Sequence, residues 1–399
     1  MIRTIAIVGG GLGALRTAEA LRQFGWTEHI CVISSEGTMP YTRPPLSKQF
    51  LEGTGEFSEV AFTPKESVSD VEWIVGDAAH RVDLAAREIT TESGRRIRFD
   101  GLVAATGVSA RRLPLPGPTE GRLSLRTVDD ARHVLSAIRE KKRLVVIGAG
   151  FIGCEIAATA RKHGCEVDVV AFDAVAMNIP LGGEVGSAIQ ARHETSGVRF
   201  HMGRTVHSIE GSERVSAVTL DDGTHLDADL VIEAIGSVPN VAWLEGNGLD
   251  LTNGVLCDEE LRMGDITAAV AVGDVARFPL PSSNGQALRI EHWQMAGDTA
   301  RHAARTLLRD LGALDEPGTP FDALASFWSD QGETSINSFG LIALADRTEV
   351  IEGSLEDDAA VAYYAGERVV GVVLLGMKRR LPFYRRWLLE QAAPALVAA

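Results

Sequence analysis

Two glycine-rich segments of the sequence have the residue types and the spacing that bind dinucleotides. In the first, TIAIVGGGLGALRTAEALRQFG, an apolar strand at 4–8 runs into Gly9, Gly11, Gly13 and Ala14, and a helical pattern follows. In this G-x-G-x-x-G/A arrangement Gly9 permits a tight turn, Gly11 lets the backbone approach a pyrophosphate, and Ala14 lets the helix pack closely on the strand. The N-terminus of the helix then offers free N–H groups to phosphates.

An acidic residue follows the next expected strand of this first segment. The strand lies in HICVISSE, which ends at Glu36, where a carboxylate can accept hydrogen bonds from ribose hydroxyls. A glycine motif alone is weak evidence. With a strand before it and an acid after the next strand, it predicts a dinucleotide site.

The second segment, KRLVVIGAGFIGCEIAATARKHGCEVDVVAF, repeats the pattern. An apolar strand at 144–147 precedes the glycine turn, and a helix and a strand at 166–171 follow it. The expected phosphate-binding turn contains Gly148, Gly150, Phe151, Ile152 and Gly153. Both copies keep all their small residues, so we expect both to bind a nucleotide rather than one to be a dead duplicate.

The acid of the second copy is displaced along the chain. The strand ends at Ala171, and the nearest carboxylate for a ribose is Asp173. The following loop, DAVAMNIPLGG, has no Arg or Lys to neutralise a 2′-phosphate, which favours NADH over NADPH. Two dinucleotide sites indicate two cofactors that exchange electrons, and FAD with NADH is the natural pair because hydride can pass from a nicotinamide to a flavin.

A proline-rich loop, MPYTRPPLSK at 39–48, follows the first nucleotide motif. Pro44 and Pro45 fix backbone φ and restrict the unfolded loop, and Lys48 stands at its end. The loop is either a rigid surface turn or a device that holds a cationic side chain still beside a cofactor.

The composition describes a globular protein of two or three domains. Of the 399 residues 45% are hydrophobic and 23% charged, and the net charge of −15 makes a general affinity for nucleic acid unexpected. Nothing in MIRTIAIVGG resembles a signal peptide, so we expect a cytoplasmic protein without a membrane partner. The four cysteines, Cys31, Cys154, Cys165 and Cys257, have no metal-ligand spacing, so we expect no metal site.

Five motifs in order, GGGLGA, PYTRPPLSK, VAATGVSARRLPLPG, GAGFIGCE and AVGDVARF, give the chain a family resemblance. It resembles the FAD-dependent pyridine nucleotide oxidoreductases, and within them the ferredoxin reductases of bacterial haem monooxygenases and ring-hydroxylating dioxygenases. The resemblance implies an α/β fold with two Rossmann-like domains, the NAD domain inserted in the FAD domain, and a C-terminal α+β domain. The implied limits are 1–112 and 243–318 for the FAD domain, 113–242 for the NAD domain, and 319–399 for the C-terminal domain.

The resemblance answers the question that the proline-rich loop raises. It implies that the loop lies along FAD with Lys48 near the reactive edge of the flavin, where a fixed ammonium stabilises negative charge. Glu155, two residues after Gly153, matches the acid that pairs with this lysine. Lys48 and Glu155 are therefore the predicted catalytic residues.

Further positions match FAD or NAD contacts of the family. Arg43 and Arg126 match FAD contacts, Ser35 stands where some relatives carry the ribose acid assigned above to Glu36, and Ala79 matches a backbone contact to the adenine. Thr106 and Gly107 match a chain crossover beside FAD, Asp274 matches the acid that binds the ribityl hydroxyls, and Trp293 matches the position facing the flavin ring. Gly236 and Pro239 match the nicotinamide pocket.

The cysteines decide where the electrons leave. Relatives that reduce disulfides carry a C-x-x-x-x-C pair beside the flavin, whereas this chain has PYTRPPLSK and no thiol in that region. We therefore expect electrons to leave singly to an iron–sulfur ferredoxin, docked near Arg301 or the basic run MKRRLPFYRRW. The alternatives are another acceptor such as rubredoxin, an NADH-switched flavoprotein with a binding role, or a subunit of a larger redox complex. The expected state is a monomer or weak homodimer.

Overall fold

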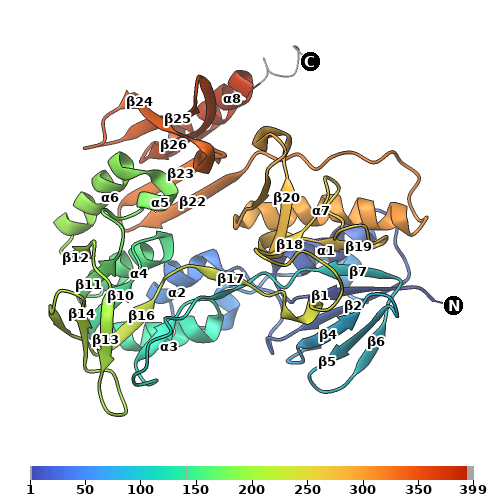
Figure 1. Cartoon of the computed structure of the whole chain (residues 1–399), viewed down its shortest axis with the longest axis horizontal. Helices are drawn as coiled ribbons and strands as arrows, with labels where there is room; N and C mark the ends of the chain where they lie inside the picture. Colours follow the sequence, from blue (N-terminus) through green and yellow to red (C-terminus); the bar gives the residue numbers. More distant parts are fainter. Residues whose placement is uncertain (1, 141, 393–399) are drawn as a thin grey trace. The chain divides into compact units, whose positions relative to one another are not determined.

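The computed structural model describes residues 2–140 and 142–392 (Figure 1). Its contacts group the chain into two units. The first unit combines Met1–Thr42, Ala61–Ser109 and Val238–Ser326, and the second combines Arg43–Val60, Ala110–Ser237 and Phe327–Ala399. The proline-rich segment from Arg43 to Val60 thus folds with the second unit. The domain limits expected from the sequence divide the chain differently and stay a prediction.

A five-stranded parallel sheet forms the centre of the first unit, in the order β19-β7-β1-β2-β3. Its strands are β1 (Thr4–Val8), β2 (His29–Ser34), β3 (Glu72–Val75), β7 (Gly101–Ala104) and β19 (Ala269–Ala271). The apolar run of β1 is buried along nearly its whole length, as expected for the central strand of a covered parallel sheet. Helices α1 (Leu12–Gln23) and α7 (Trp293–Asp310) pack against each other in this unit (Figure 1).

Two small three-stranded sheets accompany the parallel sheet in the first unit. One contains β4 (Ala79–Asp83), β5 (Glu88–Thr91) and β6 (Arg96–Arg98). The other contains β18 (Val255–Leu256), β20 (Ala276–Pro279) and β21 (Ala287–Arg289), with β18 and β20 parallel.

The second unit repeats the parallel sheet in the order β12-β11-β10-β16-β9. Its strands are β9 (Arg122–Ser124), β10 (Arg143–Ile147), β11 (Glu166–Ala171), β12 (Arg199–Met202) and β16 (Leu230–Glu233). The helices of this part of the unit are α2 (Gln49–Glu52), α3 (Val128–Arg139), α4 (Phe151–Lys162), α5 (Asn178–Leu181) and α6 (Gly183–Thr195).

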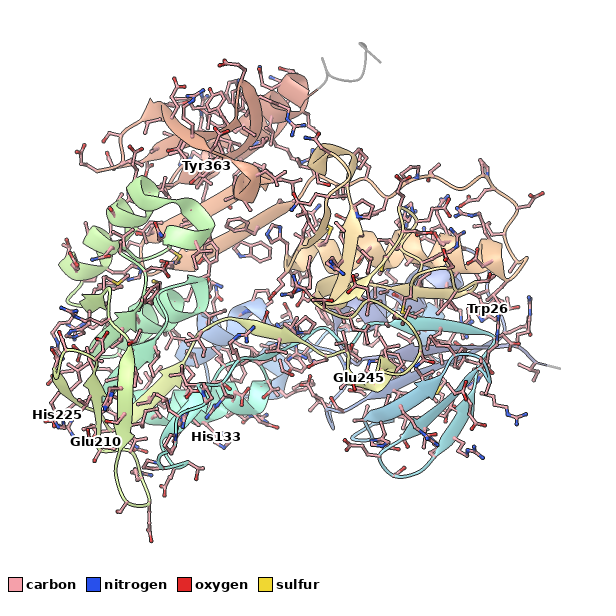
Figure 2. The ribbon with its side chains drawn as sticks, in the orientation of Figure 1. Trp26, His133, Glu210, His225, Glu245 and Tyr363 are labelled. Atoms are coloured by element: carbon pink, nitrogen blue, oxygen red, sulfur yellow. The ribbon has the colours of Figure 1, made fainter. Side chains whose placement is uncertain are left out.

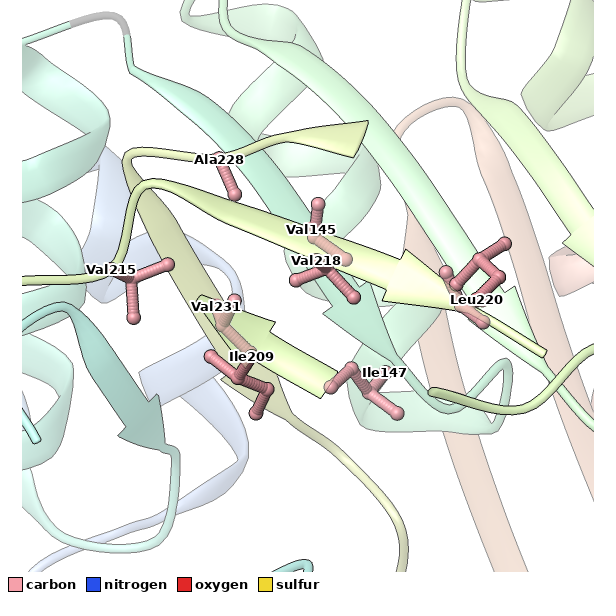
Figure 3. Close-up of a cluster of buried hydrophobic side chains, with 9 residues drawn as sticks. Val145, Ile147, Ile209, Val215, Val218, Leu220, Ala228 and Val231 are labelled. Carbon is pink, nitrogen blue, oxygen red and sulfur yellow. The ribbon is translucent and has the colours of Figure 1, made fainter. Parts of the chain in front are cut away.

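A three-stranded antiparallel sheet accompanies this parallel sheet. It contains β13 (Val206–Glu210), β14 (Ala217–Leu220) and β15 (His225–Asp227). Figure 3 shows Ile209, Val218 and Leu220 of this sheet gathered with Val145, Ile147 and Val231 of the parallel one, all buried. Apolar burial between the two layers therefore joins them in one core.

The C-terminal part of the second unit is a five-stranded antiparallel sheet in the order β22-β23-β26-β25-β24. It consists of β22 (Ser326–Gln331), β23 (Thr334–Gly340), β24 (Arg347–Gly353), β25 (Ala359–Ala365) and β26 (Arg368–Leu375), and α8 (Leu381–Ala392) follows. The buried Tyr363, labelled in Figure 2, donates a hydrogen bond of 2.7 Å to the carbonyl of Leu181 in α5. The expected fold class, two Rossmann-like sheets and a C-terminal α+β part, is confirmed.

The remaining elements are short. They are strands β8 (Val108–Ala110) and β17 (Ser237–Pro239), and the 3₁₀ turns η1 (Pro44–Ser47), η2 (Phe57–Glu59), η3 (Glu66–Val68), η4 (Ala242–Leu244), η5 (Gly273–Val275), η6 (Pro281–Ser283), η7 (Ile342–Leu344) and η8 (Lys378–Arg380). Across residues 2–140 and 142–392, none of the helices combines the length and the apolar character that crossing a bilayer requires.

Candidate cofactor-binding and active site

The first glycine turn has the geometry that a pyrophosphate needs. Gly9 has φ +125°, and a Cβ there would lie 2.1 Å from the carbonyl oxygen of Ala105, so only glycine fits. A Cβ at Gly11, in contrast, would meet no atom within 4 Å. Helix α1 begins at this open point with neither a side-chain cap nor an acid in its first turn. Its first N–H groups are therefore available to phosphate oxygens.

The second turn repeats this geometry. Gly148 has φ +107°, with its Cβ position 2.3 Å from the carbonyl oxygen of Ala234, and Gly150 is open. Helix α4 again begins without a side-chain cap or an acid, whereas α3 is closed by a capping box in which the Thr127 hydroxyl accepts from the Asp130 N–H. The two turns predicted from the sequence thus fit a dinucleotide phosphate each.

The predicted ribose acids differ in their surroundings. Glu36 is half-buried and accepts a 2.5 Å hydrogen bond from the hydroxyl of Tyr41, while Ser35 is exposed. Asp173 is also half-buried, and its carbonyl accepts a 2.9 Å bond from the N–H of Gly203. Sequence reasoning missed a basic residue near Asp173. Arg204 follows Gly203, and its N–H donates to the carbonyl of Ala171. Its guanidinium lies 2.8 Å from Asp222, so an acid already pairs with it.

Thr106 and Gly107, two predicted FAD contacts of the first unit, are hydrogen-bonded to Asn240 of another chain segment in the same unit. The hydroxyl of Thr106 donates to the carbonyl of Asn240 at 2.7 Å, and the side-chain amide of Asn240 donates back to the carbonyl of Thr106 at 3.0 Å. The backbone N–H of Asn240 also donates to the carbonyl of Gly107, which has φ +60°. Three hydrogen bonds therefore join these two chain segments, and the contact of Thr106 and Gly107 with FAD stays a prediction.

The other predicted residues of the first unit are spread over three elements. Ala79 is the first residue of β4, and Asp274 lies in η5, which packs against α7. Trp293 is the first residue of α7 and remains 40% exposed, so it is not a core tryptophan. Burial lowers the pKa of the adjacent His292 to about 4, so this imidazole is neutral at neutral pH.

In the second unit, Arg43 and Arg126 contact each other. The guanidinium of Arg43 donates to the carbonyl of Arg126 at 2.8 Å. Phe151, at the start of α4, packs edge-on against Phe327, and the adjacent Ile152 is 43% exposed. Gly236 is exposed with φ +94°.

The proline-rich loop is a short 3₁₀ turn that ends at the lysine. Pro44 and Pro45 occupy the start of η1, where a missing N–H costs no hydrogen bond. The N–H of Lys48 donates to the carbonyl of Pro45 at 3.0 Å, and its ammonium donates to the carbonyl of Pro44 at 3.1 Å. The turn therefore holds both the backbone and the side chain of Lys48.

Lys48 and Glu155 form the ion pair expected from the resemblance. The ammonium lies 2.8 Å from Glu155 Oε1, with side-chain exposures of 10% and 3%. The Ser47 hydroxyl donates to Glu155 Oε2, and the Ser329 hydroxyl donates to Oε1 at 2.5 Å. Three donors thus stabilise a carboxylate that would otherwise be costly to bury.

Two of these partners, together with a supporting threonine, were missed by sequence reasoning. Thr159, one turn beyond Glu155 on α4, donates from its hydroxyl to the carbonyl of Ser47 at 3.2 Å. In the sequence, Ser47 stands beside Lys48 and Ser329 stands in the segment FWSDQ. Neither position predicts a contact with Glu155, since the three segments lie far apart in the sequence.

All four cysteines are buried. Burial raises the pKa of Cys31, Cys154 and Cys257 to about 12. Such thiols stay protonated near neutral pH and are poor nucleophiles. Within residues 2–140 and 142–392 no group of three or more His, Cys, Asp and Glu side chains could hold a metal ion.

Comparison with known protein families assigns the chain to a family. The family model of the pyridine nucleotide-disulphide oxidoreductases matches residues 3–300, and the model of the reductase C-terminal domain matches residues 326–399. The chain belongs to the pyridine nucleotide-disulphide oxidoreductase family. The expected class, an oxidoreductase with FAD and NADH as cofactors, is thereby confirmed.

Individual relatives indicate which group of oxidoreductases in this family the chain is similar to. The chain is 34% identical to rhodocoxin reductase of Rhodococcus erythropolis, with 92% of this chain and 85% of that protein covered. It is 33% identical to the ferredoxin–NAD(+) reductase component of the anthranilate 1,2-dioxygenase system of Burkholderia cepacia, with 97% and 94% covered. The structure of the covalent putidaredoxin reductase–putidaredoxin complex aligns with a TM-score of 0.88 at 30% identity, covering 98% and 93%. These relatives confirm the resemblance to ferredoxin reductases.

Proposed function

We propose that this oxidoreductase accepts hydride from NADH onto FAD and passes the electrons singly to an iron–sulfur ferredoxin that serves an oxygenase. The observation that carries the proposal is the buried Lys48–Glu155 pair, with an ammonium 2.8 Å from the carboxylate and no cysteine beside it in the loop. FAD supplies the chemistry of taking two electrons together and releasing them one at a time. The residues of the protein must therefore hold the two cofactors, orient them and neutralise the negative charge that develops on the flavin.

In this proposal each glycine turn binds one dinucleotide. Gly9, Gly11 and the N-terminus of α1 hold the FAD pyrophosphate, and Gly148, Gly150 and the N-terminus of α4 hold that of NADH. The acids Glu36 and Asp173 orient the two riboses. We assign Asp274 to the ribityl chain and Trp293 to the edge of the flavin.

Lys48 provides electrostatic stabilisation. Its ammonium is held by the carbonyl of Pro44 and by Glu155, so it need not reorganise when negative charge develops nearby. Glu155 keeps this cation in a buried place where an unpaired charge would not stay. The pair thus delivers a fixed positive charge without leaving a net charge buried.

The acceptor part of the proposal rests on the relatives and on the inert thiols. The ferredoxin would dock near Arg301 or near the basic run of the C-terminal part. Arg301 is exposed, with its guanidinium 2.9 Å from Gln23 and over the ring of Phe24. In the basic run, Lys378 pairs with Asp330 and Arg380 with Glu352, which weakens the case for that cluster. Arg301 is therefore our preferred docking residue.

A cytoplasmic location and a monomeric or weakly dimeric state belong to the same proposal. NADH is a reductant of the cell interior, and four buried cysteines suit a reducing compartment. We propose no nucleic-acid and no membrane partner, given the net charge of −15.

The test is anaerobic stopped-flow reduction of the purified flavoprotein by NADH, followed by addition of a two-iron ferredoxin or of oxygen. We expect fast bleaching of the flavin band with NADH, fast reoxidation by the ferredoxin and slow reoxidation by oxygen. Loss of bleaching with NADH, or a reduced flavin that no iron–sulfur carrier reoxidises, contradicts the proposal. Equally fast reoxidation by rubredoxin alone would favour the other acceptor on the same scaffold.

Lys48→Ala tests the role of the ion pair. We expect FAD to remain bound while the rate of flavin reduction by NADH falls about 100-fold, the typical loss when one preorganised electrostatic partner is removed. Lys162→Ala is the matched control, because Lys162 lies on the same α4 as Glu155 but forms an exposed pair with Glu52 at 2.8 Å. Unchanged reduction kinetics in Lys48→Ala would rule out this role.

A further inference from the structure

A chain of buried hydrogen bonds continues beyond Glu155 into the C-terminal sheet. The Ser329 hydroxyl that donates to Glu155 lies 3.1 Å from Nε2 of Gln331, and Oε1 of Gln331 lies 2.7 Å from Nε2 of His193. The three side chains belong to residues that are 1%, 3% and 4% exposed. The chain therefore runs from α4 through β22 to α6 without solvent.

The donors and acceptors of this chain can be arranged in one direction. An ionised Glu155 only accepts, so the Ser329 proton must point to it. Ser329 then accepts from the amide N–H of Gln331, which turns the amide oxygen of Gln331 toward His193. His193 must meet that oxygen with a proton on Nε2. Burial lowers the pKa of His193, so the ring is neutral and carries this single proton.

Ser329, on strand β22 of the C-terminal sheet, contacts the Glu155 carboxylate directly. Its hydroxyl shares Oε1 with the Lys48 ammonium, so the direction in which Glu155 presents that oxygen depends on both donors. Gln331 and His193 in turn keep the Ser329 hydroxyl from rotating toward another acceptor. A carboxylate held by several donors has one orientation, and so does its lysine.

We propose that Ser329 is a positioning residue for the Lys48–Glu155 pair, and that Gln331 and His193 orient it through a single imidazole tautomer. The C-terminal sheet then contributes to hydride transfer and is more than a surface for the electron acceptor. This inference rests on the proposed function of Lys48 and Glu155.

The first measurement is the tautomer of His193 in the full-length flavoprotein. Long-range ¹H–¹⁵N correlation spectra of protein with labelled histidine, assigned by comparison with His193→Asn, report which ring nitrogen carries the proton. We expect Nε2 to be protonated in the unmodified chain, and a mixture of tautomers in Ser329→Ala because Gln331 loses the acceptor that orients it. A proton on Nδ1 in the unmodified chain overturns the proposal. This readout needs no turnover, so it stands even if the proposed function fails.

The second measurement is the rate of flavin reduction at saturating NADH. We expect Ser329→Ala to lower this rate about 10-fold, with bound FAD and the Kd for NADH unchanged, and Ser329→Thr to restore it. The matched control is Ser338→Ala, since Ser338 is equally buried on the neighbouring β23 and its hydroxyl has no hydrogen-bond partner among residues 2–140 and 142–392. Equal losses in Ser329→Ala and Ser338→Ala, or no loss in Ser329→Ala, overturn the positioning role.

Discussion

The two dinucleotide folds of this reductase share their backbone hydrogen bonds but differ in the side chains placed on them. In the first fold the N–H of Gly9 donates to the carbonyl of Ile33, and in the second that of Gly148 donates to Val170. Helices α1 and α4 are each twelve residues long and start at equivalent glycines. The register therefore allows a position in one fold to be compared with its counterpart in the other.

The strand ends show where the folds diverge. The N–H of Gly76 donates to the carbonyl of Glu36, and that of Gly203 donates to Asp173, so the displaced acid of the second fold is the structural equivalent of Glu36. The apparent displacement in the sequence arises because Ala171 and Phe172 replace two serines before it. The shared backbone geometry thus places an acid, the predicted ribose contact, at the same point of both folds.

The helices diverge in charge. Four residues after Phe151, the first residue of α4, lies the buried Glu155, whereas the equivalent position four residues after Leu12 is Arg16, which pairs with Glu19 at 2.7 Å on the same helix. A charge at this point is neutralised within α1 in the first fold. In the second fold the charge of Glu155 is neutralised by Lys48 of the proline-rich loop, and our proposal gives this pair the catalytic role.

The largest expected effect tests the third small residue of each turn. The first fold has Ala14, fully buried, whereas a Cβ at the equivalent Gly153 would lie 2.0 Å from the carbonyl oxygen of Gly148. We expect Gly153→Ala to lower the free energy of unfolding by about 1–3 kcal/mol through overpacking and to weaken NADH binding at least about 10-fold. Urea denaturation and NADH titration measure both.

Ala14→Gly is the control for this comparison. It should cost only about 1 kcal/mol, the usual price of glycine within a helix, and leave FAD bound. A Gly153→Ala variant as stable as the parent chain would show that the two turns are equally tolerant.

A smaller effect is expected for the two ribose acids. Glu36→Ala should weaken FAD binding about 10-fold and leave the KM for NADH unchanged, while Asp173→Ala should raise that KM about 10-fold and leave the FAD content unchanged. FAD content by absorbance and steady-state kinetics measure the two effects. If Asp173→Ala leaves the KM unaltered, the equivalence of the two acids holds for the backbone only.

The smallest expected effect is on stability, and it concerns a buried position in β2 and the equivalent position in β11. Cys31 in β2 and Asp168 in β11 are equivalent, because they pair with Ala6 and Val145 of the preceding strands. Burial acts to raise the pKa of Asp168, but hydrogen bonds from Arg199 and His201 outweigh it and hold the pKa below its usual value. A depressed carboxyl pKa stabilises the folded chain above about pH 4, and this contribution is lost as the pH falls through the folded pKa.

We therefore expect Asp168→Asn to be less stable than the parent chain at pH 7 by about 1 kcal/mol, with the difference shrinking toward pH 3. Cys31→Ser, the equivalent change in the first fold, should give a stability difference that does not vary over this range. Urea midpoints between pH 3 and 7 measure both. A constant difference for Asp168→Asn would contradict the ionised pair.

Much of this molecule follows from local sequence. Strands β1 and β11 have the limits expected for them, because mostly apolar runs that end in a glycine turn or a loop favour covered parallel strands. Gly9 and Gly148 were identified from the two glycine motifs, and their positive φ angles in the structure explain why glycine is needed there. The motifs also identified Lys48 and Glu155, although only through a family resemblance.

Tertiary structure decided the rest, since it brings together residues far apart in the sequence. Ser47, Glu155 and Ser329 meet only when the proline-rich loop, α4 and β22 pack in one unit, and no period or spacing in the chain encodes that meeting. The same holds for His193, which reads from sequence as one polar residue in a helix and becomes the buried end of a hydrogen-bond chain. Local patterns determine where strands, turns and helices form, whereas the burial of a charge depends on which distant donors reach it.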